Sequence, residues 1–121
     1  MSDAPKTILI VEDERPLSHA LELKLQHEGF SVFTAGNGQE GLDLINKQHF
    51  DVVLMDLIMP EMDGFQMLEQ IQKMPKPPAV IVLSNLSQHE DEERVLAMGA
   101  KHFFIKSDTP LTIIVEEVKK I

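Results

Sequence analysis

The chain has 121 residues, and its 11 basic and 20 acidic side chains give a formal net charge of −9. This length fits one domain with a hydrophobic core, and the absence of cysteine excludes disulfides, thiolate metal sites and cysteine nucleophiles. The acidic balance argues against direct nucleic-acid binding. No apolar run reaches the roughly 20 residues that span a bilayer, and the N-terminus does not resemble a signal peptide. We therefore expect a cytoplasmic protein without membrane insertion.

Five short apolar runs, rich in β-branched or aromatic residues, predict β-strands. They cover residues 7–11, 31–35, 51–55, 79–83 and 102–105. Three of them are apolar almost throughout, which is typical of strands covered on both faces. The second run is the most polar, so we expect it at an edge of the sheet.

Amphipathic segments of helical length separate these runs. The first follows Pro16, a favourable first helical residue, and ends at Gly29. Later ones centre on 42–50, 65–71 and 95–98, and the last begins near 109–110 and runs to the end of the chain. Five alternating strands and helices are typical of an α/β fold with a parallel sheet. We expect a single domain over 1–121, ordered from about residue 5, with no output domain.

Polar side chains follow four of the predicted strands: Glu12 and Asp13, then Asp56, Ser84 and Lys106. Parallel sheets bind ligands beyond the carboxyl ends of their strands, so we expect these side chains at one rim. Carboxylates suit a hard cation such as Mg²⁺. Lys106 and Ser84 suit phosphoryl oxygens. Asp56, at the end of the central strand, is the best candidate to accept a phosphoryl group as an acyl phosphate.

Each of these residues also has a purely structural interpretation. The acidic run 12–14 could complement the dipole of the following helix. Asp56 could be a turn residue, Ser84 a helix cap and Lys106 a solvated strand end. Because all of them fall at the same rim, the pattern favours a functional site.

The motifs around these residues resemble the response regulator receiver domain of two-component signalling. The similarity covers nearly the whole chain and lies in Ile10-Val11-Glu12-Asp13-Glu14, Met55-Asp56-Leu57-Ile58-Met59-Pro60-Glu61-Met62-Asp63-Gly64, Val82-Leu83-Ser84 and Gly99-Ala100-Lys101-His102-Phe103-Phe104-Ile105-Lys106. The D-x-x-M-P-x-M-D-G stretch is highly specific. The resemblance implies a flavodoxin-like, doubly wound (βα)5 fold. Its five-stranded parallel sheet has the order 2-1-3-4-5, with helices on both faces.

The resemblance also implies the chemistry. Asp56 would accept a phosphoryl group from a sensor histidine kinase or phosphotransfer protein, which makes the chain a phospho-acceptor that assists its own phosphorylation and dephosphorylation rather than an enzyme. Asp13 and Asp56 would ligate Mg²⁺ directly. Glu12 would help through a water molecule, and the backbone carbonyl of Ile58 would be a further ligand.

The response to phosphorylation is implied in the same way. Ser84 and Lys106 would hold the phosphoryl oxygens, and Phe103 stands at the position of a switch aromatic whose rotamer follows Ser84. A phosphoryl group adds up to two negative charges. Drawing Ser84 and Lys106 toward these charges would change a surface of the fourth helix, fifth strand and fifth helix, which contacts an unknown downstream protein.

Two departures from the family pattern lead to predictions. The family usually has a proline in a cis peptide after the lysine, whereas Ser107 follows Lys106 here. A cis bond before a non-proline residue costs about 2.5–4 kcal/mol, so we expect a trans peptide. Ile58 and Leu86 are apolar where the family often has polar groups. We expect them to exclude the hydrolytic water and lengthen the lifetime of the acyl phosphate.

Other functions remain open on the sequence alone. Gly36, Gly38 and Gly41 match the glycine pattern of a dinucleotide-binding turn, with Asp56 20 residues beyond the first of them. This interpretation leaves the rim residues without roles, and a glycine-rich turn before a helix explains the pattern. An aspartyl-phosphate hydrolase would need a second aspartate where Ile58 stands. A receiver-like interaction module that is never phosphorylated would be expected to lose the acidic cluster, which this chain keeps.

Overall fold

The computed structural model describes residues 5–59, 62–85 and 89–121. One parallel sheet contains the strands β1 (Thr7–Val11), β2 (Ser31–Ala35), β3 (Val52–Asp56), β4 (Ala79–Ser84) and β5 (His102–Ile105), in the order β2-β1-β3-β4-β5. The helices are α1 (Arg15–His27), α2 (Gly38–Lys47), α3 (Gly64–Gln72), α4 (His89–Ala97) and α5 (Leu111–Lys119). The doubly wound fold, the strand order and the position of the second strand at an edge are therefore confirmed.

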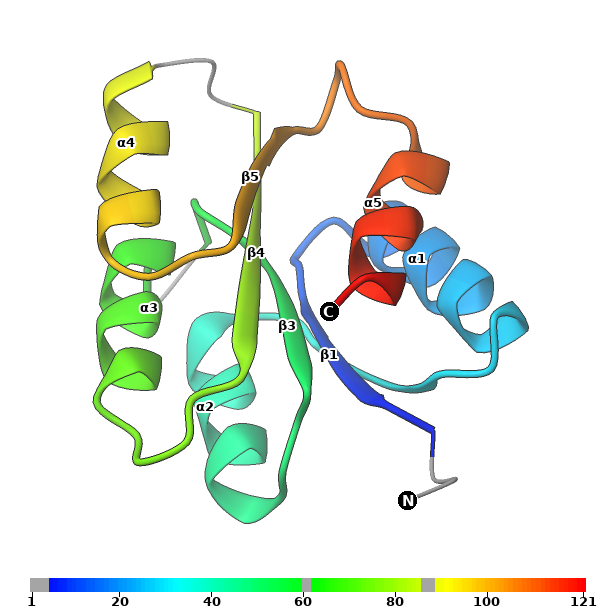
Figure 1. Cartoon of the computed structure of the whole chain (residues 1–121), viewed down its shortest axis with the longest axis horizontal. Helices are drawn as coiled ribbons and strands as arrows, with labels where there is room; N and C mark the ends of the chain where they lie inside the picture. Colours follow the sequence, from blue (N-terminus) through cyan, green and yellow to red (C-terminus); the bar gives the residue numbers. More distant parts are fainter. Residues whose placement is uncertain (1–4, 60–61, 86–88) are drawn as a thin grey trace.

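The helices cover both faces of the sheet. α1 and α5 lie on one face, and α2, α3 and α4 lie on the other (Figure 1). Successive residues of a strand point to opposite faces. Leu9 thus joins the core beneath α2 and α3, whereas Ile8 and Ile10 pack with Leu21 beneath α1 and α5. Burial on both faces explains why β1, β3 and β4 are apolar almost throughout.

Two strands end one residue later than their apolar runs predict. In β3, Asp56 pairs with Leu83 of β4, and the N–H of Leu57 continues the pairing with the carbonyl of Leu83 at 3.0 Å. Asp51 lies just before β3, and its carboxylate accepts a hydrogen bond from the N–H of Thr7 at 2.8 Å. Asp56 and Ser84 are therefore the last residues of their strands rather than the first residues of loops.

The segment after β3 turns tightly into α3. Asp63 caps this helix by accepting the N–H of Gln66 at 2.9 Å, while the Gln66 side chain accepts the N–H of Asp63 at 3.3 Å. Gly64 follows, and its N–H reaches the carbonyl of Leu57 at 2.6 Å. A methyl group on Gly64 would lie 2.6 Å from Cα of Leu57, so only glycine fits there. The Asp-Gly pair thus fixes the path of the chain beside Asp56.

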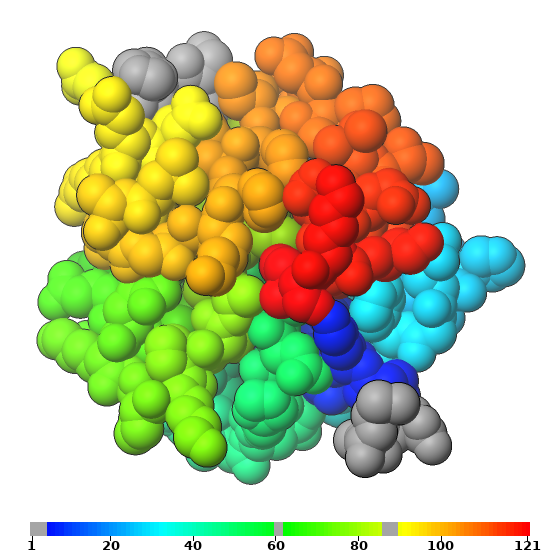
Figure 2. Space-filling view, in the orientation of Figure 1, coloured from blue at the N-terminus to red at the C-terminus, as the bar shows by residue number. Residues whose placement is uncertain are grey.

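The carboxyl ends of the strands point to the upper edge of Figure 1, where the loops that follow them gather. In Figure 2, α4, β5 and α5 adjoin one another on the face toward the viewer. Across the three described ranges, no helix combines the length and the apolar character needed to cross a membrane.

Candidate functional site

The parallel sheet brings three carboxylates together at its carboxyl edge. Glu12 and Asp13 follow β1, and Asp56 ends β3, the neighbouring strand in the centre of the sheet. One oxygen of each lies within 4.8 Å of the others. Glu12 and Asp56 are only 2% and 6% exposed, whereas Asp13 is exposed to solvent. The predicted acidic cluster is thus present at the predicted edge.

Lys106, which follows β5, supplies the counter-charge for this cluster. Its Nζ donates a hydrogen bond to Oδ2 of Asp56 at 3.0 Å and lies 2.7 Å from Oε2 of Glu12. A third carboxylate, that of Glu14, accepts a hydrogen bond from the same Nζ at 2.6 Å. Three carboxylates (Glu12, Glu14 and Asp56) thus surround one ammonium group. Asp13 adds a fourth carboxylate to the cluster, so three negative charges are uncompensated when all four are ionised.

Burial and charge shift the pKa values of this cluster. Burial raises the pKa of Glu12 from 4.5 to about 7, although Lys106 and the N–H of Glu14 act in the opposite direction. Burial likewise raises the pKa of Asp56, and Lys106 partly offsets this effect. Burial alone would lower the pKa of Lys106, but the surrounding carboxylates outweigh it and raise that pKa above its ordinary value. The site therefore disfavours further negative charge and favours cations.

A hollow of about 320 Å³ opens over Asp56. Asp13, Ile58 and Ser84 line it, together with Glu14 and Asn85. Ser84 is buried, while Ile58 is 57% exposed at the surface of the hollow. The N–H of Ile58 donates to Oδ1 of Asp56 at 3.3 Å, whereas Lys106 binds Oδ2, so each carboxylate oxygen has its own donor. The predicted residues Ser84 and Ile58 therefore lie beside Asp56.

The donor atoms fit a hard divalent cation. Such an ion takes oxygen ligands, and proteins usually hold Mg²⁺ through one or two carboxylates and water. Oε2 of Glu12 is buried and has no hydrogen-bond partner among the described residues, so its attraction to Lys106 is that of an ion pair. This buried oxygen and the two further carboxylates form a cluster of negative charge, where a cation or its bound water lowers the free energy.

Three further predictions concern Phe103, the peptide bond after Lys106, and Leu86. Phe103 is half-buried and packs on the face of α2, α3 and α4, and it is not part of the carboxylate cluster. All peptide bonds among the described residues are trans, including that between Lys106 and Ser107, as predicted. Leu86 lies outside the described residues, so its predicted place at the site has no structural counterpart here.

Glu14 is the site residue that the sequence analysis did not assign. The acidic run 12–14 was interpreted either as ligands at positions 12 and 13 or as charges that complement a helix dipole. Glu14 does precede α1, but its side chain turns to Lys106, 92 positions away. The only signal in the sequence was a third consecutive acid, which does not reveal a partner at that distance.

The glycine pattern near α2 has a packing explanation. A methyl group on Gly38 would lie 2.9 Å from the carbonyl oxygen of Met62, and one on Gly41 would lie 2.8 Å from Cε of Met67 and 2.9 Å from Cγ2 of Val11. Asn37 caps the helix through the N–H of Glu40. Close helix packing therefore accounts for these two glycines without a dinucleotide.

Similar solved structures include several receiver domains. The receiver domain of the Francisella response regulator 1452 superposes with a TM-score of 0.89 at 26% identity, over 95% of this chain and 94% of that one. A CheY-like receiver domain protein from Methanospirillum hungatei gives 0.89 at 28% identity, over 96% and 92%. The response regulator TrrA from Thermotoga maritima, solved in complex with Mg²⁺-BeF, gives 0.83 at 31% identity, over 95% and 97%.

Sequence relatives lead to the same family. The cell cycle response regulators CtrA of Brucella ovis and Brucella abortus are each 32% identical over 99 residues, which is 82% of this chain. The chain spans only 43% of the length of these relatives. The family model of the response regulator receiver domain matches residues 8–116. With the fold, the acidic edge and this match in agreement, the chain belongs to the response regulator receiver domains, which are signalling modules of two-component systems and not classical enzymes.

Proposed function

We propose that this receiver domain accepts a phosphoryl group on Asp56 from a phospho-histidine of a sensor histidine kinase or phosphotransfer protein. The observation that carries the proposal is the setting of the Asp56 carboxylate. One oxygen pairs with Nζ of Lys106 at 3.0 Å, the other accepts the N–H of Ile58 at 3.3 Å, and a hollow opens above the group. A carboxylate held from two sides and facing an open space is oriented for attack on a ligand in that space.

In the proposed transfer, an oxygen of Asp56 attacks the phosphorus of the phospho-histidine. The P–N bond breaks as the O–P bond forms, and its electron pair returns to the imidazole nitrogen. Phosphoryl transfer depends mainly on positioning and on charge neutralisation. Lys106 already lies beside the accepting carboxylate, and Ser84 lines the same hollow, so both are placed to bind phosphoryl oxygens.

Glu12, Asp13 and Asp56 are the side chains that would hold Mg²⁺ in this proposal, with the backbone carbonyl of Ile58 as a further ligand. The support is their donor set, three carboxylates whose oxygens lie within 4.8 Å of one another, and the similarity to a response regulator solved with Mg²⁺-BeF. A bound divalent cation would neutralise phosphoryl charge at the site. The same carboxylates repel an anionic phosphodonor when no cation is present.

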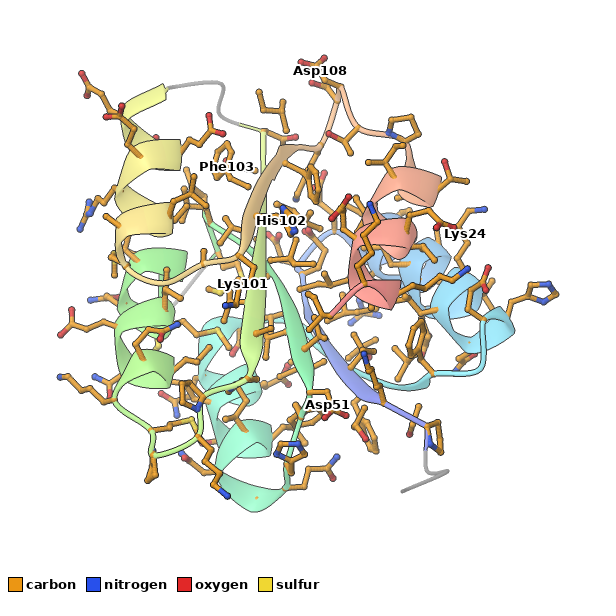
Figure 3. All side chains as sticks on the ribbon, viewed as in Figure 1. Lys24, Asp51, Lys101, His102, Phe103 and Asp108 are labelled. Carbon is orange, nitrogen blue, oxygen red and sulfur yellow. The ribbon has the colours of Figure 1, made fainter. Side chains whose placement is uncertain are left out.

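Phosphorylation is proposed to act through Ser84 and Phe103 on a surface formed by α4, β5 and α5. Phe103 lies on the side of β5 that faces α4, and Asp108 marks the loop from β5 to α5 (Figure 3). Lys106 connects this region to the site, since it follows β5 directly and contacts Asp56. The proposed output is contact with a downstream protein.

Intact mass after treatment with acetyl phosphate and Mg²⁺ tests the proposal. The wild type is expected to gain one phosphoryl group, and Asp56→Asn to gain none. Asp108→Asn is the matched control, since it removes one carboxylate from an exposed position after Lys106, and it is expected to be phosphorylated like the wild type. A wild type that forms no adduct with either acetyl phosphate or phosphoramidate would favour the unphosphorylated interaction module.

A further inference from the structure

Glu14 stands at the N-cap position of α1 but does not cap the helix. Within the described chain, its side chain makes no hydrogen bond to the first turn of α1. Its N–H donates to Oε1 of Glu12 at 3.0 Å, and its carboxylate reaches Nζ of Lys106 at 2.6 Å. A Ser, Thr, Asp or Asn side chain at this position commonly accepts one of the free N–H groups of the helix. The contact of Glu14 with Lys106 replaces that ordinary role.

The three carboxylates on Lys106 differ in how firmly they are held. An ammonium group has three N–H donors, and three carboxylates surround this one, those of Glu12, Glu14 and Asp56. Glu12 and Asp56 are buried and each accepts a backbone N–H as well. The Glu14 side chain is 51% exposed, whereas that of Lys106 is 7% exposed. Glu14 is therefore the partner that can turn into water at the lowest cost.

We propose that Glu14 is a positioning residue that occupies Lys106 in the unphosphorylated domain and competes with the phosphoryl group for it. The inference rests on the proposed function, because a phosphoryl group on Asp56 would need a donor from Lys106. The oxygens of the phosphoryl group would enter the hollow that Glu14 lines. Release of Glu14 is then part of the transition to the phosphorylated state. The carboxylate of Glu14 sets how readily that state forms.

Binding of Mg²⁺ and beryllofluoride, a phosphoryl mimic, tests the competition through ¹⁹F NMR titration. Glu14→Gln keeps the size of the side chain and removes its charge, so this variant is expected to bind beryllofluoride about two- to fivefold more tightly than the wild type. Asp108→Asn also removes one exposed carboxylate, but the Asp108 side chain makes no hydrogen bond or ion pair within the described ranges. This control is expected to bind like the wild type. Equal affinity in Glu14→Gln and Asp108→Asn would overturn the proposal.

A double-mutant cycle tests the contact without any phosphoryl group. Urea unfolding of Glu14→Gln, Lys106→Met and the double variant is expected to be non-additive, because the two side chains interact directly. The same cycle with Asp108→Asn in place of Glu14→Gln is expected to be additive. Additivity in both cycles would overturn the proposal. If the wild type failed to bind beryllofluoride while the first cycle was non-additive, the proposed function and the competition would fail, and only the contact would remain.

Discussion

Nζ of Lys106 and Oδ2 of Asp56 lie 3.0 Å apart, although β4 separates the strands that carry them. The sheet register allows this contact, because Asp56 pairs with Leu83 and Ser84 pairs with Ile105, so that β3 and β5 end at nearly the same level. The lysine then reaches across the end of β4. Its side chain is 7% exposed, so the pair is shielded from water and from salt.

Replacing Lys106 with methionine removes the counter-charge and leaves the carboxylates to repel one another. Without divalent cations, we expect Lys106→Met to lower the free energy of unfolding by about 1–3 kcal/mol. Excess Mg²⁺ should recover more of the stability of this variant than of the wild type. Urea unfolding followed by circular dichroism, with and without Mg²⁺, measures both effects.

Lys120→Met is the control for this variant, because the Lys120 side chain is 69% exposed and pairs with Glu117 of α5 at 3.3 Å. Surface pairs of this kind contribute roughly 0–1 kcal/mol. If Lys106→Met were as stable as Lys120→Met without Mg²⁺, repulsion among the buried carboxylates would not lower the stability of the domain as expected.

The raised pKa of Glu12 predicts a dependence of stability on pH. The folded state holds a proton on Glu12 up to about pH 7, whereas the unfolded chain releases it near 4.5. The unfolded state therefore binds fewer protons across this window, and the contribution of Glu12 to stability falls as the pH rises through it. Without divalent cations, Glu12→Gln should gain stability relative to the wild type between these pH values, by up to about 3 kcal/mol.

The free energy of unfolding of Glu12→Gln and of the wild type is measured in urea at a series of pH values. The difference between the two free energies is plotted against pH. This difference cancels the titration of groups that do not interact with Glu12, and leaves that of Glu12 with its partners Asp56 and Lys106. Glu69→Gln serves as the control for the loss of one carboxylate, because Glu69 is an exposed residue of α3 paired with Lys73 at 3.4 Å, and such surface pairs contribute little to stability. A stability difference for Glu12→Gln that does not change between pH 4.5 and about 7 would contradict a raised pKa of Glu12.

Much of the fold follows from local sequence patterns. Each strand is an apolar run and each helix carries a periodic apolar stripe, so the alternation and the parallel sheet are predictable. Gly29 and Gly99 adopt positive φ values of 95° and 107° just after α1 and α4, where glycine is the expected helix terminator. The strand ends were less predictable. Asp56 extends β3 because its backbone pairs with β4, a contact that no local pattern encodes.

The site was predictable to the extent that it depends on strand ends. Glu12, Asp13, Asp56 and Lys106 converge because parallel strands place their carboxyl ends at one edge. The conformation of a long side chain is not set by this rule. Glu14 turns to Lys106 instead of capping α1, because the buried ammonium group attracts it more strongly than the exposed helix end. That choice depends on tertiary electrostatics, and the sequence alone does not reveal it.

Gly64 should be intolerant of any side chain. Its Cβ would lie 2.6 Å from Cα and 2.7 Å from the carbonyl oxygen of Leu57, which are backbone atoms that cannot rotate away. We expect Gly64→Ala to cost about 2 kcal/mol or more in unfolding free energy, because the turn beside Asp56 must shift. Gly36→Ala is the control, since its nearest atom is the flexible end of Glu40 at 3.4 Å. Equal unfolding midpoints for both variants in urea would refute the steric argument.

Ile58 offers a test of how long the proposed acyl phosphate survives. Its side chain is 57% exposed at the hollow above Asp56, where an apolar group disfavours an ordered water molecule. Asparagine at this position would offer that water a hydrogen bond, so Ile58→Asn should speed dephosphorylation severalfold. The rate is measured by following the loss of the phosphoryl adduct by intact mass after the phosphodonor is removed.

Ile113→Asn is the control, because it makes the same chemical change at a residue of α5 that does not line the hollow. The Ile113 side chain is 46% exposed, and this variant should keep the wild-type rate. If Ile58→Asn decayed no faster than Ile113→Asn, exclusion of water by Ile58 would not control the lifetime.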